Sequence, residues 1–203
     1  MNLFKKIIFL FRKPLVICVL GKDYSVTKKI ISELLSKKNF DFEIIGSELI
    51  NKEVFREIEF MLKKSRFCIL VINRFESEKE TIWIKDLIMA IPSRGVLVFN
   101  FDNEQNKEII KSIHIPFLTY GFYKKSDLQA TDLNIDINTK EEKNNDETNF
   151  KVNYLGSIVP FWIKNISLKE EIYNILAAIA VGIVLDMNLV EISQKIKALK
   201  IKE

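Results

Sequence analysis

Apolar runs and amphipathic stretches alternate along the first 121 residues. Continuous apolar runs predict buried strands at 15–20, 42–45, 67–72, 96–99 and 115–120. Apolar residues spaced three and four positions apart predict helices around 30–35, 54–62, 83–91 and 104–112. This β-α-β-α order predicts an α/β fold with a doubly wound, mainly parallel sheet.

The pattern changes after residue 121. Residues 128–137 alternate as a solvent-facing strand, 138–149 are polar and typical of a mobile hairpin tip or loop, and 150–154 and 158–163 are further strands. Two helices follow. Ser167 with Glu170, and Asn188 with Glu191, have the spacing of N-terminal caps. We therefore expect a small antiparallel β lobe and two C-terminal helices after the parallel sheet.

Composition adds few constraints. The chain has 203 residues, 48% of them hydrophobic and 29% charged, which suits one globular domain. A net charge of +4, with lysines and glutamates spread along helix faces, argues against nucleic-acid binding. The two cysteines, Cys18 and Cys68, lie in apolar runs, which is typical of reduced core residues in a cytoplasmic protein.

The N-terminal residues 1–13 form a basic amphipathic segment that we separate from the domain at 14–203. The apolar run at 7–11 is too short to span a bilayer, and no small-residue cleavage site follows it. A short helix packed on the domain is the favoured interpretation, and contact with a membrane surface is the alternative.

The first strand runs into a site that looks like an altered phosphate loop. Gly21 ends the strand and an amphipathic helix follows, which is the layout that places phosphate at a helix N-terminus. A phosphate loop also needs a second glycine, a lysine and a hydroxyl residue. Those positions hold Tyr24, Ser25 and Val26. The layout of a nucleotide-binding domain is present, but the side chains that would hold the nucleotide and its magnesium are not.

Three segments in the second half carry a resemblance to a known family. Residues 91–102 read IPSRGVLVFNFD, residues 119–121 read TYG, and residues 174–182 read NILAAIAVG. In this order and spacing they resemble the central ATPase domain of the Mur ligases, which join an amino acid or dipeptide to a peptidoglycan precursor. The resemblance extends over residues 14–199 and is strongest to the D-alanyl-D-alanine-adding type. It implies a P-loop-NTPase-like domain.

The resemblance breaks at the catalytic positions. Aligned on Gly21, the lysine of the family falls at Ser25, and its magnesium-binding glutamate after the third strand falls at Asn73. The lysine that the family carbamylates falls at Ile84, beside Lys85. The 203 residues also hold no counterpart of the flanking domains that complete the active site in the family. We therefore expect no catalytic residues, no metal ligands and no cofactor, with ATP and magnesium bound only if some nucleotide binding is retained.

Other positions keep the residue types of the family near the adenine and the nucleotide. The vestigial nucleotide-binding set predicted from them is Gly21, Ser25, Thr27, Asn100, Asp102 and Asn174. Each has a structural alternative. Thr27 suits a helix cap, Asn100 and Asp102 suit a turn at a strand end, and Asn174 suits a buried amide that bonds to a neighbouring loop.

Three functions remain open. The first is a non-catalytic, degenerate Mur-ligase-like module that binds a protein partner or itself, in the setting of peptidoglycan precursor synthesis. The second is an ATP-dependent acid–amino-acid ligase that works with a partner chain. The third is a peripheral membrane module anchored by residues 1–13.

Overall fold

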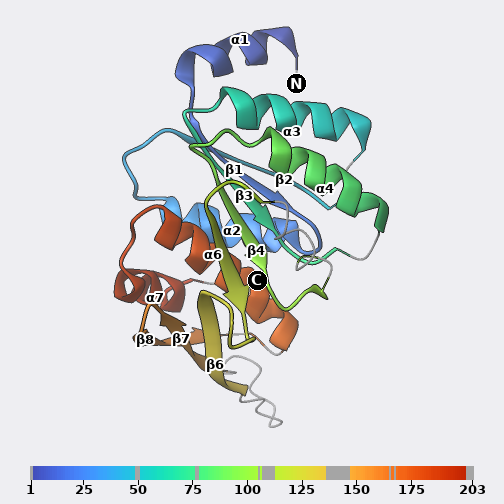
Figure 1. Ribbon diagram of the computed structural model, residues 1–203. Coiled ribbons are helices and arrows are strands. Elements are labelled where there is room, and N and C mark those ends of the chain that lie inside the picture. The colour runs from blue at the N-terminus through green and yellow to red at the C-terminus, as the bar shows by residue number, and fades with distance from the viewer. Residues whose placement is uncertain are drawn as a thin grey trace, which may run out of the picture.

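One mixed sheet of eight strands organises the chain. The computed structural model describes residues 2–48, 51–75, 78–104, 106, 113–135, 147–164, 166 and 168–199. The strands lie in the order β2-β1-β3-β4-β5-β6-β7-β8 (Figure 1). Neighbours are parallel from β2 to β6 and antiparallel from β6 to β8. The bounds are β1 Leu15–Leu20, β2 Phe42–Ser47, β3 Phe67–Ile72, β4 Val96–Asn100, β5 Phe117–Gly121, β6 Leu128–Ile135, β7 Glu147–Tyr154 and β8 Ser157–Lys164.

Helices cover both faces of the parallel part. On one face lie α2 (Tyr24–Leu35), α6 (Lys169–Val184) and α7 (Leu189–Lys197). On the other lie α3 (Lys52–Lys64) and α4 (Glu78–Ala90), with α1 (Leu3–Arg12) beside α3 (Figure 1). All six residues of β1 are buried, and alternate ones enter the two cores. A strand covered on both faces requires the continuous apolar run seen in the sequence.

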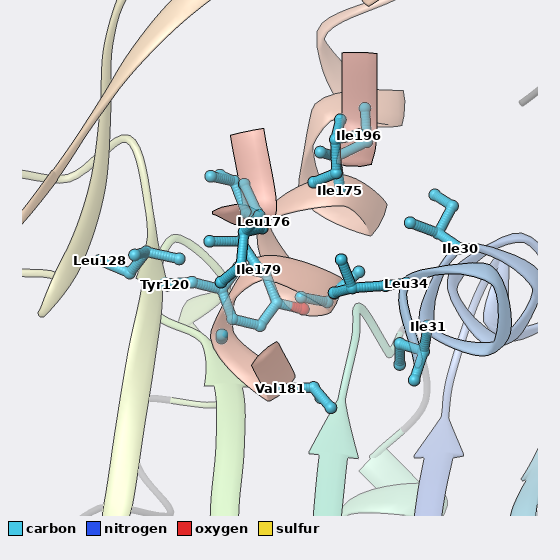
Figure 2. Close-up of a cluster of buried hydrophobic side chains, with 14 of the residues drawn as sticks. Ile30, Ile31, Leu34, Tyr120, Leu128, Ile175, Leu176, Ile179, Val181 and Ile196 are labelled. Atoms are coloured by element: carbon cyan, nitrogen blue, oxygen red, sulfur yellow. The ribbon is translucent and has the colours of Figure 1, made fainter. Parts of the chain in front are cut away.

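The larger core joins segments far apart in the chain. Side chains of α2 (Ile30, Ile31 and Leu34) face side chains of α6 over the sheet (Figure 2). Small residues let these helices approach closely. A methyl group on Gly182 would lie 2.8 Å from Ile192 and 3.2 Å from Leu34. The alanine-rich segment read in the sequence therefore serves close helix packing.

The expected antiparallel strands are present, and they continue the main sheet. β6 joins β5 through two residue pairs, Tyr120 with Leu128 and Gly121 with Gln129. Phe150 of β7 and Phe161 of β8 stack at 5.6 Å inside the same core that contains α6. The sequence shows where these strands are, but not that their apolar face is buried against the C-terminal helices.

The helix caps and two segments expected from the sequence can be compared with the structure. Asn188 caps α7, because its side chain accepts a hydrogen bond from the Val190 N–H at 2.8 Å. Ser167 lies outside the described residues. The cap that the structure shows is one position later, where Glu171 accepts from the Leu168 N–H at 3.1 Å. The expected helix at 104–112 and the polar stretch at 138–149 lie largely outside the described residues.

Candidate functional site

A cleft of about 490 Å³ lies at the carboxyl ends of the central parallel strands. This is where ligands bind in open α/β sheets. Its walls come from the loop after β1, the ends of β3, β4 and β5, and the start of α6. The lining residues are Lys22, Asp23, Val26, Asn73, Arg74, Asn100, Tyr120, Ile166, Leu168, Glu170, Glu171, Tyr173 and Asn174.

The loop between β1 and α2 is only three residues long. Gly21 takes a φ of +101°, and a methyl group there would lie 2.8 Å from the carbonyl oxygen of Arg74. Only glycine meets both demands without strain. Asp23 takes a φ of 58° and stands at the N-cap of α2 without a side-chain capping bond. Tyr24 begins the helix, with its ring against Gly46 of β2, where an added methyl group would lie 2.6 Å from the ring.

Several of the backbone donors at the positions of a phosphate loop are used within the protein here. The Gly21 N–H donates to Ser47 at 3.0 Å and the Lys22 N–H donates to Arg74 at 3.0 Å. At the helix start, the Val26 and Thr27 N–H groups both donate to the carbonyl of Asp23, at 3.0 and 3.1 Å. An anion at this helix end would have to displace these bonds.

A buried network of neutral groups fills the space beside this loop. Thr27 is fully buried, and its hydroxyl donates to the Asn174 side-chain oxygen at 2.9 Å. The side-chain amide of Asn73 donates to the Thr27 hydroxyl at 2.9 Å and to the Lys22 carbonyl at 3.2 Å. The network thus ties the end of β3 to α2 and α6.

Tyr120 of β5 completes the network. Its hydroxyl donates to the Asn73 side-chain oxygen at 3.0 Å. Burial raises the pKa of the Tyr120 phenol far above its ordinary value, so the hydroxyl keeps its proton and acts as a donor. Asn106 adds a second layer, because its amide donates to the carbonyls of Asn73 at 3.2 Å and Asn100 at 3.0 Å.

Asp102 organises the loop after β5. Its carboxylate accepts from the Phe122 N–H at 2.7 Å, the Tyr123 N–H at 2.9 Å and the Tyr173 hydroxyl at 2.9 Å. Burial, followed by the hydrogen bond to Asp102, raises the pKa of the Tyr173 phenol well above its ordinary value. The side chain of Asn100 turns back to accept from the Asp102 N–H at 2.9 Å. These bonds fix the strand end and the start of α6.

The residues present do not fit magnesium-ATP. The cleft is lined by two cations, Lys22 and Arg74, and by three carboxylates, Asp23, Glu170 and Glu171. This charge balance disfavours a triphosphate. The Thr27 hydroxyl and the Asn73 amide lie beside the loop. They bond to each other and to other groups of the protein. Among the described residues no group of three or more His, Cys, Asp or Glu side chains is placed to hold a metal ion.

The structure brings some of the six predicted site residues together and separates others. Asn100 and Asn174 line the cleft, Gly21 is buried at its edge, and Thr27 bonds to Asn174. Asp102 does not belong to the cleft lining, but it accepts a hydrogen bond from Tyr173, which does. Ser25 is exposed on α2 and does not belong to the lining. Thr27 is not a helix cap, because it lies one turn inside α2 with its hydroxyl directed to α6.

For three residues of the site, the sequence does not indicate the polar contacts that they make. Tyr120 stands in the TYG segment at the end of a predicted strand, Tyr173 in a predicted helix, and Asn106 in the helix predicted at 104–112. Their roles depend on hydrogen bonds to residues that are far away in the sequence. At the position of the carbamylated lysine, Ile84 is buried in the core under α4 while Lys85 is exposed. Lys85 therefore does not replace the missing lysine.

Comparisons of the sequence and of the structure both find UDP-N-acetylmuramate ligases. No family model matches the chain. The UDP-N-acetylmuramate–L-alanine ligase of Caldanaerobacter subterraneus subsp. tengcongensis is 33% identical over 110 residues, covering 54% of this chain and 22% of that protein. The ligase of the same name from Alkaliphilus metalliredigens is 25% identical, covering 87% of this chain and 42% of that protein.

Solved structures give the fold. MurF ligase from Thermotoga maritima, in complex with ADP, superposes with a TM-score of 0.73 at 14% identity, covering 96% of this chain and 50% of that one. The UDP-N-acetylmuramate:L-alanyl-gamma-D-glutamyl-meso-diaminopimelate ligase from Neisseria meningitides gives 0.71 at 13% identity, covering 97% and 69%. The chain has a fold similar to that of these ligases.

This chain spans less than half the length of the curated relatives described above. Those relatives are L-alanine ligases, whereas the solved structures include MurF and the meso-diaminopimelate ligase. The comparisons therefore support the family resemblance and its central domain, and they do not select the D-alanyl-D-alanine-adding type.

Proposed function

We propose that this Mur-ligase-like domain is a non-catalytic binding module connected with peptidoglycan precursor synthesis. The observation that carries the proposal is the neutral network of Asn73, Thr27, Asn174 and Tyr120, which occupies the place beside the β1–α2 loop. Phosphoryl transfer depends on a lysine and metal ions to neutralise developing charge. In this network an amide meets a hydroxyl, and neither contributes a formal charge.

The loop itself supports the same proposal. The N–H groups of Gly21 and Lys22 already donate to carbonyls of the protein. Asp23 places a carboxylate on the cleft wall where a phosphate would approach. Binding a triphosphate there would break hydrogen bonds and bring like charges together, and both cost free energy. The fold is retained, while the groups that perform the chemistry of the family have been replaced.

The second candidate is an ATP-dependent acid–amino-acid ligase completed by a partner chain. The cleft itself favours this candidate, because about 490 Å³ at the strand ends is enough for a small ligand. Asn100 and Asn174 line it and match the residue types that the family places near the nucleotide. Under this candidate the partner would supply the missing cations.

Nucleotide titration separates the two candidates. The full chain is titrated with ATP and ADP, with and without magnesium, by calorimetry and thermal unfolding, and phosphate release is measured. We expect no phosphate release and no binding tighter than about 1 mM, which corresponds to about −4 kcal/mol. A dissociation constant near 1 μM, about −8 kcal/mol, that is lost in Asn174→Ala contradicts the proposal.

The binding role needs its own test. Purified full-length peptidoglycan precursor ligases from the same cell are mixed with the chain and analysed by sedimentation velocity, together with the chain alone. We expect a stable complex with a ligase or a homo-oligomer formed around the cleft. Leu168→Glu, at a cleft residue that is 57% exposed, should weaken it. Leu155→Glu, at the β7–β8 turn, is the matched control because Leu155 is 85% exposed and lies away from the cleft.

A further inference from the structure

Helix α1 presents its apolar side away from the domain. One residue of α1, Phe9, is buried, and its ring lies 6.0 Å from the ring of Phe60 on α3. Successive residues of a helix are rotated by about 100°, so the side opposite Phe9 is formed by residues on a single arc of roughly 160°. That arc holds Leu3, Phe4, Ile7, Ile8, Leu10 and Phe11, which are all exposed.

The exposed side is large and held in a fixed orientation. Phe4 and Phe11 are 71% and 85% exposed, and Leu3 is 75% exposed. At the C-terminal end of the helix, the guanidinium of Arg12 bonds to Asp41 through Nε at 3.0 Å and to Glu43 at 3.3 Å. These contacts, with Phe9, keep the apolar residues pointing outward. The helix lies at the edge of the molecule beyond α3 (Figure 1). Exposed apolar side chains gathered on one side of a helix are typical of an interaction surface.

The charged residues of α1 and of its C-cap, Lys13, are all positive, and Arg12 among them is paired with Asp41 and Glu43. Residues 1–13 contain Lys5, Lys6, Arg12 and Lys13 and no Asp or Glu. Lys6 lies on the side of Phe9, with its ammonium group 5.4 Å from the Phe60 ring centre. Lys5 and Arg12 stand at one border of the apolar arc. An apolar face bordered by lysine and arginine is the pattern of helices that lie in a lipid–water interface.

We propose that α1 docks this domain on an anionic lipid surface, with the helix lying in the plane of the interface. The ten-residue helix is about 15 Å long, so it cannot cross a bilayer. None of the described helices has the length and apolar character to do so. A second copy of the chain is the weaker occupant, because pairing two α1 surfaces brings two sets of basic residues together. The proposal does not depend on what the cleft binds.

Vesicle co-sedimentation tests the proposal. The full chain is mixed with vesicles of phosphatidylcholine alone and with phosphatidylcholine containing phosphatidylglycerol. We expect binding to the anionic vesicles only, weakened by salt because screening reduces the attraction. Phe4→Ser with Phe11→Ser should lower the partition coefficient at least roughly tenfold. Lys5→Ala and Lys13→Ala should lower it roughly fivefold each.

The control is Leu155→Ser with Ile158→Ser, which removes two exposed apolar residues at the β7–β8 turn, 85% and 61% exposed. This variant should bind vesicles like the unchanged chain. Circular dichroism and the thermal midpoint verify that both double variants are folded. Failure of the unchanged chain to bind anionic vesicles overturns the proposal. So does an equal loss in the control variant. A dimer that dissociates in the α1 variant, without vesicle binding, would assign the surface to a second copy instead.

Discussion

The side-chain amide of Asn73 donates a hydrogen bond to the hydroxyl of Thr27 at 2.9 Å, across the end of β3 and the first turn of α2. The resemblance to the Mur ligases places a magnesium-binding carboxylate at position 73. With an amide there, the same geometry becomes a neutral hydrogen bond. The polar groups of the site therefore bond to one another, and they stabilise the junction of β3 with α2 and α6.

Thr27→Val should destabilise the protein. It removes the donor to Asn174 and one acceptor of Asn73 in a region that excludes water, leaving an amide oxygen unsatisfied. The expected loss is about 1–3 kcal/mol of unfolding free energy, measured by urea denaturation. Ser25→Ala on the same helix is the control, since Ser25 is exposed. Its effect should stay within about 0.5 kcal/mol. Equal effects would show that the network contributes nothing particular.

Asn73→Glu should not restore a metal site. Asn73 is 4% exposed, so the substitution places a carboxylate in a buried position and removes the donor to Thr27. We expect a loss of roughly 3 kcal/mol in unfolding free energy. The test is the unfolding free energy of the variant, measured by urea denaturation with and without millimolar magnesium. Magnesium-dependent recovery of stability would mean that the other groups of a metal site are still in place.

Gly21→Ala and Gly156→Ala should differ in cost. Both glycines have a positive φ, +101° and +81°, so alanine brings backbone strain of about 1 kcal/mol at either position. At Gly21 the new methyl group would also lie 2.8 Å from the Arg74 carbonyl, whereas nothing lies within 4 Å at Gly156. We expect Gly21→Ala to cost at least about 1 kcal/mol more. Thermal or urea unfolding of the two variants gives the difference, and equal losses would contradict the close approach.

The cysteines should make stability fall at alkaline pH. Burial raises the pKa of the Cys68 thiol from about 9 to about 11, and burial raises that of Cys18 further. A thiol whose pKa is raised in the folded state stabilises it fully below the unfolded value. That contribution is lost as the pH rises from about 9 toward 11. Unfolding at pH 8 and pH 10 should show the decrease, and Cys68→Ala should reduce its slope. An unchanged slope would contradict burial of an intact thiol.

The repeating pattern of the sequence was sufficient to predict the parallel half of the fold. Strands covered on both faces must be apolar along their whole length, and Leu15–Leu20 and Phe67–Ile72 are. The antiparallel strands were predicted as well, but alternation reports that one face is buried and not what covers it. No pattern in the sequence predicts the two residue pairs that join β6 to β5.

The candidate site was predictable only in part. Gly21 carried a signal because a strand-to-helix turn needs a positive φ there. Thr27 is predicted as part of the nucleotide-binding set, with a helix cap as the alternative. No local pattern indicates its contact with Asn174, which lies 147 positions further along the chain. Tyr120 and Tyr173 were missed because an aromatic residue in a strand or helix reads as packing until its hydroxyl is seen to meet a polar group.

The bond between Thr27 and Asn174 also bears on how the chain folds. β1 and α2 are made before α6, which covers the same face of the sheet and comes from residues 169–184. A nascent chain that has emerged only as far as β5 leaves the apolar side of α2 without its neighbour. These core contacts must wait until residues 169–184 have left the ribosome. Long-range contacts of this kind slow folding and expose the half-made sheet to aggregation.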